Sequence, residues 1–453
     1  MGLEKEKAMR GEVRILSSLD PLQKEAAKQR EGTLCLIAGA GSGKTGTVTS
    51  RIALALEEGA WKPSKTAAIA FSNQAALSLR ARLSLMTEKK IRVSTFHSLA
   101  FSQLRRLWSL FALSPFPSLM EERDCALLLA KSSPSLPPPR LLMAIKWAKS
   151  SLISPSELKE ACSYCSFKVP VGFEEAWRKY EMLKKEKGAI DFDDIFLLLL
   201  RILKSSREAR KLVEESFESV TVDEYQDVSP AQHAVLKFWT NKAQSVCVVG
   251  DPAQTIYSFA GSSSWFLEHA KGDFPSPYRQ ISLSSNYRSG REIIRCANSV
   301  LAPSPKKYVR QACTLKSRGA VSKESFSDFS ALAARAAKLA QDREKGKSVA
   351  ILARSRRDLD AVKKELSSRL IPVSDSGREK KEGVALFTIH SAKGLEWDRV
   401  ILVIGTEKVE MTEEERRILY VACTRAKERL DILFLPSPRN LSRFLPFIPS
   451  KGL

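Results

Sequence analysis

Two short stretches of the sequence carry residue types that could handle a phosphorylated ligand, and the first is AGAGSGKT at 38–45. It follows a strand-like run and precedes a helix-like one. Backbone N–H groups of a glycine-rich turn converge on phosphate oxygens, and the N-terminus of the next helix adds positive potential. In this pattern Lys44 reaches the terminal phosphates and Thr45 ligates Mg²⁺. Ala38 stands where the strict pattern has glycine, and a chance glycine-rich turn is the alternative.

The second stretch, TVDEYQD at 221–227, places carboxylates directly after a β-branched run. A phosphate-loop nucleotidase needs a second strand that ends in a carboxylate for Mg²⁺, beside a group that activates the attacking water. We therefore predict Asp223 as the metal carboxylate and Glu224 as the general base. The acidic pair alone is weak evidence, but together with AGAGSGKT it predicts a site for Mg²⁺ and ATP.

The elements that must position these residues are short apolar or β-branched runs separated by helix-like segments. They form two series, first 33–39, 66–72, 218–224 and 245–251, then 280–286, 348–354, 383–390, 399–405 and 429–435. Strands that alternate with helices predict parallel sheets, and two series predict two α/β domains. Residues 104–187, rich in Leu, Lys, Arg and Trp, predict a mostly helical insertion. Its SSPSLPPP stretch (132–139) is typical of a stiff loop, with a proline-rich ligand for a partner as the alternative.

Charge and composition indicate the class of partner. The chain has 73 Lys and Arg against 51 Asp and Glu, a net charge of +22, which favours a polyanion such as nucleic acid. The sequence contains no long apolar run and no signal-peptide pattern, so we expect a cytoplasmic, nucleoid-associated protein that does not bind membranes. Eight cysteines fit a reducing compartment. Cys162 and Cys165 have a metal-ligand spacing but lack a second pair, so a structural role is favoured over a metal site.

Ten motifs between residues 19 and 430 occur in the order of one known family. They are LDPLQKEAA, AGAGSGKT, AFSNQAA, STFHSLA, IDFDDI, VDEYQD, VVGDPAQTIYSFAGS, LSSNYRS, TIHSAKGLEWD and YVACTRAKERL. In this the chain resembles the superfamily 1 UvrD/Rep-like helicases. The resemblance implies two RecA-like parallel-sheet domains: 1A (residues 1–103 and 188–278, interrupted by a helical 1B subdomain at 104–187) and 2A (279–453).

The resemblance also implies nucleotide-binding roles at the matching positions. Gln23 would read adenine, Tyr287 would stack on it and Glu396 would contact the ribose. Gln254, beside Asp251, would sense the γ-phosphate, and Arg288 and Arg425 would stabilise charge on the transferred phosphoryl group. The predicted ATP set is Gln23, Ala38, Gly39, Ala40, Gly41, Ser42, Gly43, Lys44, Thr45, Tyr287, Arg288, Glu396 and Arg425, and the predicted catalytic set is Lys44, Glu224, Gln254, Arg288 and Arg425.

A second set of matching residues would line a groove for single-stranded nucleic acid. It comprises Phe71, Asn73, Phe96, His97, Tyr257, Phe259 and His390. Aromatic faces stack on any base and polar neighbours hold phosphates, so such a groove binds without reading sequence. Burial in the core is the alternative for Phe71 and Phe96, because both adjoin predicted strands.

The chain departs from the family pattern at three places. Phe259-Ala260-Gly261 stands where the family usually has Trp-Arg-Gly, which puts coupling or the grip on DNA in question. Gly46 stands where an arginine is common after GKT. Only about thirty residues separate 348–354 from TIHSAKG, where full-length members insert a large 2B domain. A short tail follows 429–435, so no appended nuclease or partner-binding domain is expected.

The resemblance thus implies an ATP-dependent DNA helicase or translocase. It would move 3′→5′ on single-stranded DNA or at duplex junctions and hydrolyse ATP between 1A and 2A. One alternative is a single-strand translocase or motor subunit that does not unwind duplex alone. Others are a binding module without turnover and a motor that runs on RNA. Protein partners are not predicted.

Overall fold

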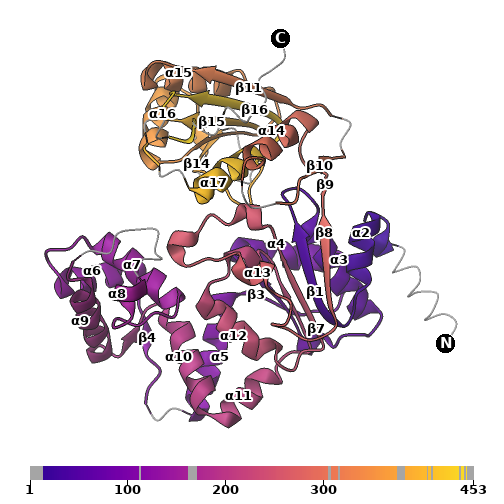
Figure 1. Cartoon of the computed structure of the whole chain (residues 1–453), viewed down its shortest axis with the longest axis vertical. Coiled ribbons are helices and arrows are strands. Elements are labelled where there is room, and N and C mark those ends of the chain that lie inside the picture. The colour runs from indigo at the N-terminus through magenta and orange to yellow at the C-terminus, as the bar shows by residue number, and fades with distance from the viewer. Residues whose placement is uncertain are drawn as a thin grey trace. The chain divides into compact units, whose positions relative to one another are not determined.

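The computed structural model describes residues 14–445, except 112–113, 162–170, 305–307, 315–316, 375–382, 406, 410–411, 438–439 and 443–444. Cys162 and Cys165 therefore lie outside the described residues. The chain divides into two compact units (Figure 1). The first unit comprises 1–37, 45–250 and 257–281, and the second comprises 38–44, 251–256 and 282–453. Each unit contains one six-stranded sheet.

The first sheet has the strand order β3-β2-β6-β7-β1-β8. Its strands are β1 (Gly32–Ala38), β2 (Thr66–Ala70), β3 (Arg92–Thr95), β6 (Ser219–Val222), β7 (Ser245–Gly250) and β8 (Tyr278–Leu283). The pairs that join β3, β2, β6, β7 and β1 are all parallel. Strands β1, β2, β6 and β7 are buried along their whole length, as expected for a parallel sheet covered by helices on both faces. Residues 280–283 of the predicted run 280–286 belong to β8 of the first sheet, so their assignment to the second series of strands was wrong.

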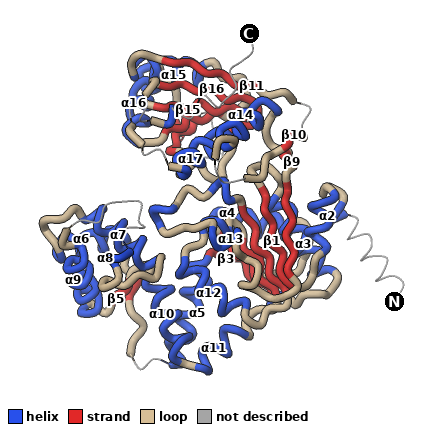
Figure 2. Tube along the Cα trace, viewed as in Figure 1, coloured by secondary structure: helices blue, strands red, loops and turns tan. Residues whose placement is uncertain are grey.

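Helices surround this sheet (Figure 2). They are α2 (Pro21–Lys28), α3 (Lys44–Glu57), α4 (Asn73–Ser84), α5 (Phe96–Phe111), α10 (Asp194–Ser205), α11 (Arg207–Glu214), α12 (Pro230–Thr240) and α13 (Trp265–Glu268). Helix α3 begins at the end of the phosphate-loop motif and is buried from Thr47 to Leu56. The burial of this helix holds the glycine-rich turn at the carboxyl end of β1.

The segment between β3 and β6 contains a helical subdomain, defined here as residues 118–190. Its helices are α6 (Glu122–Ser132), α7 (Pro138–Ser150), α8 (Leu158–Ala161) and α9 (Phe173–Glu186), which gather beside the sheet in Figure 1. They enclose a separate apolar core around Leu129, Leu141 and Tyr180. A short parallel pair, β4 (Ser118–Leu119) and β5 (Ala189–Ile190), joins the two ends of the subdomain. The end of the predicted proline-rich loop is helical, because proline is tolerated in the first turn of a helix and α7 begins at Pro138.

The second sheet has the order β11-β16-β15-β12-β14-β13, and all its pairs are parallel. Its strands are β11 (Ala320–Ser325), β12 (Val349–Ala353), β13 (Val373–Ser374), β14 (Val384–Thr388), β15 (Trp397–Ile404) and β16 (Ala426–Phe434). Its helices are α14 (Arg291–Leu301), α15 (Phe329–Gln341), α16 (Arg356–Ser368) and α17 (Glu413–Cys423). A short parallel pair, β9 (Ser285–Asn286) and β10 (Ala312–Cys313), precedes them. The predicted fold class, two parallel-sheet α/β domains, is confirmed. In the described parts of the chain, no helix is both long and apolar enough to cross a membrane.

Candidate nucleotide and nucleic-acid sites

The glycine-rich loop at 38–44 packs against the segment that contains Asn286 and Tyr287. The Asn286 side-chain amide donates a hydrogen bond to the Ala40 carbonyl at 2.6 Å, and the Tyr287 N–H donates to the Gly41 carbonyl at 2.9 Å. Gly41 has φ +70°, and a Cβ there would lie 2.5 Å from the Asn286 amide nitrogen. Only glycine tolerates both constraints, so Gly41 allows the loop to pack closely against Asn286.

Asp251, Gln254 and Arg425 form one hydrogen-bonded series within the second unit. Gln254 donates from Nε2 to Asp251 Oδ2 at 2.8 Å and accepts at Oε1 from Arg425 Nη2 at 3.2 Å. Lys393 Nζ donates to the Gln254 backbone carbonyl at 2.5 Å. Gln254 and Arg425 are 4% and 2% exposed. This series links the GDPAQ and CTRA motifs, although 171 positions separate the two residues.

Arg288 and Glu396, to which the resemblance assigns separate parts of the nucleotide, form an ion pair. Arg288 Nε lies 2.6 Å from a Glu396 carboxylate oxygen, and Lys427 Nζ lies 3.1 Å from the other. Burial raises the pKa of Glu396, but the two cations outweigh burial and the pKa is lowered. Glu396 therefore remains charged, and a phosphate that bound Arg288 would have to compete with this carboxylate.

Asp223 and Glu224 follow β6 in the first unit. Glu224 has φ +53° and ψ +41°, a left-handed conformation that costs a residue other than glycine about 1–3 kcal/mol. Its N–H donates to Asp223 Oδ1 at 2.9 Å, and its Oε2 accepts from Gln226 Nε2 at 2.5 Å. This turn changes the direction of the chain, so the two adjacent side chains do not follow the alternation of an extended strand. The oxygen donors of Asp223 and Thr45 suit Mg²⁺.

Gln23, predicted to read adenine, takes part in the start of α2. Its side-chain oxygen accepts from the Asp20 N–H at 3.0 Å, and its own N–H donates to Asp20 Oδ1 at 2.8 Å. This reciprocal capping box gives Gln23, which is 4% exposed, a structural role. Its contact with adenine stays a prediction.

Three predicted nucleic-acid residues form a row of aromatic rings in the first unit. The rings of Phe71 and Tyr257 stack with centroids 5.5 Å apart, and those of Tyr257 and Phe259 lie 6.1 Å apart, edge to face. Phe71 is 43% exposed and Phe259 is 39% exposed. Asn73, at the start of α4, is exposed as well. Exposed rings in sequence along a surface are what base stacking requires.

Phe96 does not belong to this row. It is 4% exposed and stacks on Trp239 with ring centroids 5.9 Å apart, so the core interpretation holds for it. Its neighbour His97 instead stacks on Phe192 at 4.4 Å. Phe192 is 50% exposed and was missed in the sequence, although it lies in the IDFDDI motif. An aromatic residue between acidic ones was the signal that could have identified it.

The predicted histidines are neutral at physiological pH. Burial lowers the pKa of His97 to about 4. Burial, with repulsion from Arg354 and Lys393, lowers the pKa of His390 to about 4. Both side chains can therefore offer one donor and one acceptor but no positive charge. His390 belongs to the second unit, whereas His97 belongs to the first.

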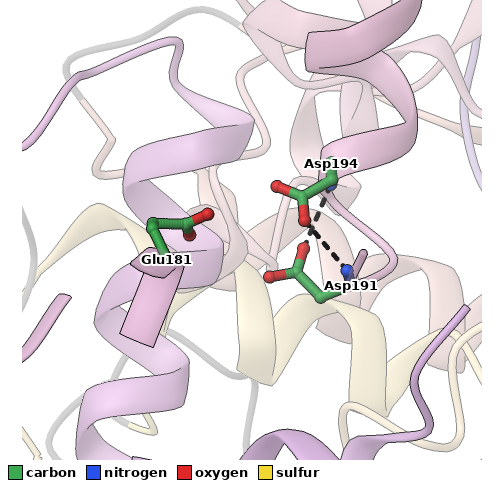
Figure 3. Close-up of side chains that lie close together, drawn as sticks. All are labelled: Glu181, Asp191 and Asp194. Carbon is green, nitrogen blue, oxygen red and sulfur yellow. Dashed lines mark hydrogen bonds between the residues drawn. The ribbon is translucent and has the colours of Figure 1, made fainter. Parts of the chain in front are cut away.

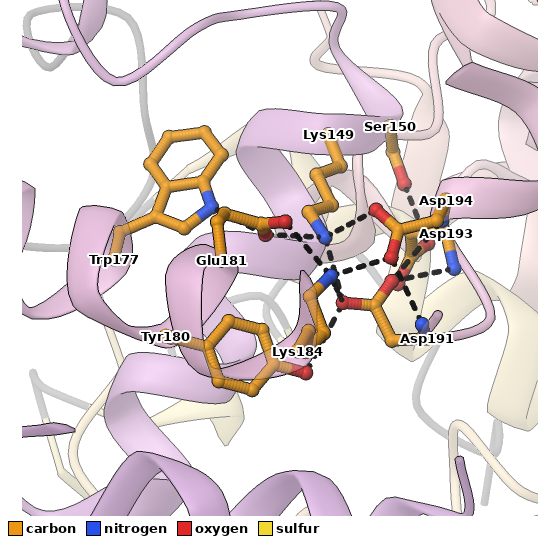
Figure 4. Close-up of polar contacts among 9 residues, drawn as sticks. All are labelled: Lys149, Ser150, Trp177, Tyr180, Glu181, Lys184, Asp191, Asp193 and Asp194. Atoms are coloured by element: carbon orange, nitrogen blue, oxygen red, sulfur yellow. Dashed lines mark hydrogen bonds and ion pairs between the residues drawn. The ribbon is translucent and has the colours of Figure 1, made fainter. Parts of the chain in front are cut away.

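Three carboxylates in the first unit have a spacing that could suit a metal ion. Oxygens of Glu181, Asp191 and Asp194 lie within 4.8 Å of one another (Figure 3). Two lysines, however, occupy the space between them (Figure 4). Lys149 Nζ lies 2.6 Å from both aspartates and 2.7 Å from Glu181, and Lys184 Nζ lies 2.5–2.9 Å from the same three groups. Ammonium groups thus neutralise most of this negative charge, and we assign no metal here.

This ion-pair network connects the helical subdomain to α10. Lys149 is on α7, Lys184 is on α9, Asp191 lies between β5 and α10, and Asp194 is the first residue of α10. Burial lowers the pKa of Lys149, but the three carboxylates outweigh burial and hold the pKa well above its ordinary value. Burial likewise raises the pKa of Asp191, and the two lysines reverse this and lower it. Lys149 and Asp191 therefore remain charged, and the network fixes α7 and α9 against the IDFDDI motif.

Comparison with known proteins identifies relatives along almost the whole chain. The model of the UvrD/REP helicase N-terminal domain matches residues 19–275, and that of the UvrD-like helicase C-terminal domain matches 281–380 and 374–436. ATP-dependent DNA helicase UvrD2 of Mycobacterium tuberculosis H37Rv is 28% identical, over 95% of this chain and 81% of that protein. ATP-dependent DNA helicase PcrA of Bacillus subtilis 168 is 32% identical, over 63% of this chain and 40% of that protein.

Proposed function

The chain belongs to the UvrD/REP helicase family, and from this membership we propose that it is an ATP-dependent DNA helicase. It would translocate 3′→5′ along single-stranded DNA and hydrolyse ATP at the cleft between domains 1A and 2A that the resemblance implies. The observation that carries the proposal is the Asp251–Gln254–Arg425 series. Within the second unit it joins the GDPAQ motif to the arginine of the CTRA motif, the two motifs that the resemblance assigns to the terminal phosphate.

Each predicted residue has a chemical task in this proposal. Glu224 would accept a proton from the attacking water, while Lys44, Arg288 and Arg425 would neutralise charge that develops on the phosphoryl oxygens. Thr45 and Asp223 would hold Mg²⁺, which when bound neutralises phosphate charge. Gln254, already bonded to Arg425, would make the position of that arginine depend on the terminal phosphate. Nucleotide-dependent movement of the second unit would follow from such contacts.

The aromatic row would provide the track. Phe71, Tyr257 and Phe259 would stack on successive bases without selecting a sequence, and the net charge of +22 would attract the phosphate backbone. Neutral His97 and His390 would hydrogen-bond the strand. Single-stranded DNA and its junctions with duplex are thus the proposed partners.

The short connection between β12 and β14 in the second unit is relevant to whether this protein unwinds duplex DNA by itself. Between β12 and β14 the described residues form only α16 and β13. The alignment with UvrD2 is 573 positions long, although this chain has 453 residues, so that relative carries insertions. We propose that this chain lacks a 2B domain, which keeps open a single-strand translocase or motor subunit without autonomous unwinding.

Tailed duplexes test direction and unwinding together. The protein should separate a duplex that carries a 3′ single-stranded tail, with ATP, and leave a duplex with a 5′ tail intact. The Lys44→Ala variant serves as the control without hydrolysis. Preference for the 5′ tail would contradict the proposed direction. ATP-driven displacement of streptavidin from single strands, without separation of either duplex, would favour the translocase.

A further inference from the structure

A pocket of about 410 Å³ lies between the helical subdomain and the turn that carries Phe259, a volume within the roughly 300–1,000 Å³ of small-ligand sites. All of its lining residues belong to the first unit. The subdomain contributes Glu122 and Arg123 from α6 and Leu142, Met143 and Lys146 from α7, and the opposite side is formed by Phe259 and Ala260.

The pocket continues the aromatic row. Rings follow one another from Phe71 to Tyr257 to Phe259 at 5.5 Å and 6.1 Å, and Phe259 is both the last ring and a wall of the pocket. The small side chain of Ala260 lines the same wall. A strand stacked along the row would therefore reach this pocket next.

The chemistry of the walls suits one nucleotide. Leu142, Met143 and Phe259 offer apolar and aromatic surface for a base. Arg123 is exposed, and the structure gives it no carboxylate partner among the described residues. Lys146 is 38% exposed and has as its ion-pair partner Glu122, 3.3 Å away and 75% exposed. An ion pair so accessible to water contributes little, so a phosphate can replace it at small cost.

The wall formed by α7 is held in place on both sides. Lys149, one turn after Lys146, is fixed by the buried ion-pair network shown in Figure 4. Ser150 lies against Gly261, where an added Cβ would come within 2.9 Å of the serine Cβ. A pocket with fixed walls loses little entropy when a ligand binds.

We propose that this pocket binds one nucleotide of the single-stranded DNA, with its base against Phe259 and Met143 and its phosphate against Lys146 and Arg123. The inference rests on the proposed function and extends the DNA track from the sheet onto the helical subdomain. In this proposal Arg123 and Lys146 of the helical subdomain bind DNA.

The test compares two double variants that remove the same charge. In Arg123→Gln/Lys146→Gln both changes line the pocket. In Lys131→Gln/Arg140→Gln the changes lie on the same helices, α6 and α7, at exposed positions outside the pocket lining. Binding of fluorescein-labelled oligo(dT) is followed by anisotropy at several salt concentrations, and unfolding midpoints are measured for all proteins.

We expect the pocket variant to bind roughly 3- to 30-fold more weakly than wild type. The slope of log K against log salt should fall by about 0.7, since the variant loses one phosphate contact and each contributes about 0.7 on a single strand. The control should keep the wild-type slope. Equal affinity and slope for the two double variants, both with wild-type unfolding midpoints, would overturn the inference. If wild type itself failed to bind oligo(dT), the proposed function would fail instead.

Discussion

Two lysines one turn apart on α7 have opposite environments. Lys149 is 2% exposed and lies among three carboxylates, whereas Lys146 is 38% exposed and forms an ion pair with the exposed Glu122. The charge of Lys149 is neutralised by carboxylates inside the fold, and the folded state depends on this pairing. The charge of Lys146 remains available to a ligand. In a chain of such high positive charge, the environment of each cation indicates which ones can meet DNA.

The largest effect should come from Lys149→Met. The change leaves three carboxylates with a single ammonium partner, and breaking a buried pair in this way costs about 3–5 kcal/mol. Lys146→Met should change the free energy of unfolding by less than about 0.5 kcal/mol. Urea titration measures both. Equal destabilisation by the two changes would remove the distinction between the two lysines.

Phe96 and Phe259 extend the comparison to aromatic residues. Phe259→Ala should weaken oligo(dT) binding by about 1–3 kcal/mol, the value of one base stacked on an aromatic ring, and leave the unfolding midpoint unchanged. Phe96→Leu should have the reverse pattern, with a loss of about 1–2 kcal/mol in stability and unchanged affinity, because its ring packs on Trp239. Anisotropy and urea titration on both variants provide the check. A loss of affinity confined to Phe96→Leu would reverse our assignment.

Asp193 should give an effect on stability that depends on pH. Burial and the Asp191 and Asp194 carboxylates raise its pKa to about 7, against the opposing influence of Lys149 and Lys146. Between about pH 4 and 7 the folded chain then holds a proton that the unfolded chain has lost, so this group lowers stability as pH rises. Asp193→Asn should match the wild-type melting temperature near pH 4 and exceed it increasingly up to pH 7. A difference that stays constant with pH would contradict the raised pKa.

The smallest effect is expected from the histidines. His97 and His390 have pKa values lowered to about 4, so neither changes charge between pH 6 and 8. The affinity of His97→Gln/His390→Gln for oligo(dT) should follow the same pH profile as wild type over this range. A step near pH 6.5 that only wild type shows would mean that at least one of them titrates there.

Local sequence patterns predicted the strands well because buried parallel strands are continuous apolar runs. They did not assign β8 to its sheet, since strand order depends on packing and not on sequence order. The motif resemblance predicted Gln254 and Arg425, which the structure joins. The resemblance did not show whether Phe96 lies in the core or lines the nucleic-acid groove. That depends on the packing of its ring against Trp239, which is distant in the sequence.

The helical subdomain was the least predictable part. Its ion-pair network brings together Lys149 and Asp191, 42 positions apart, and no local pattern relates them. The network also requires Lys184, which in the sequence resembles the other lysines of α9. Only the fold shows which of these cations are buried.

The most direct measurement is ATP hydrolysis with and without single-stranded DNA, for wild type and Glu224→Gln. We predict strong stimulation by DNA in wild type and none in the variant, which should still bind oligo(dT). Absence of hydrolysis by wild type in the presence of DNA would contradict the proposed motor.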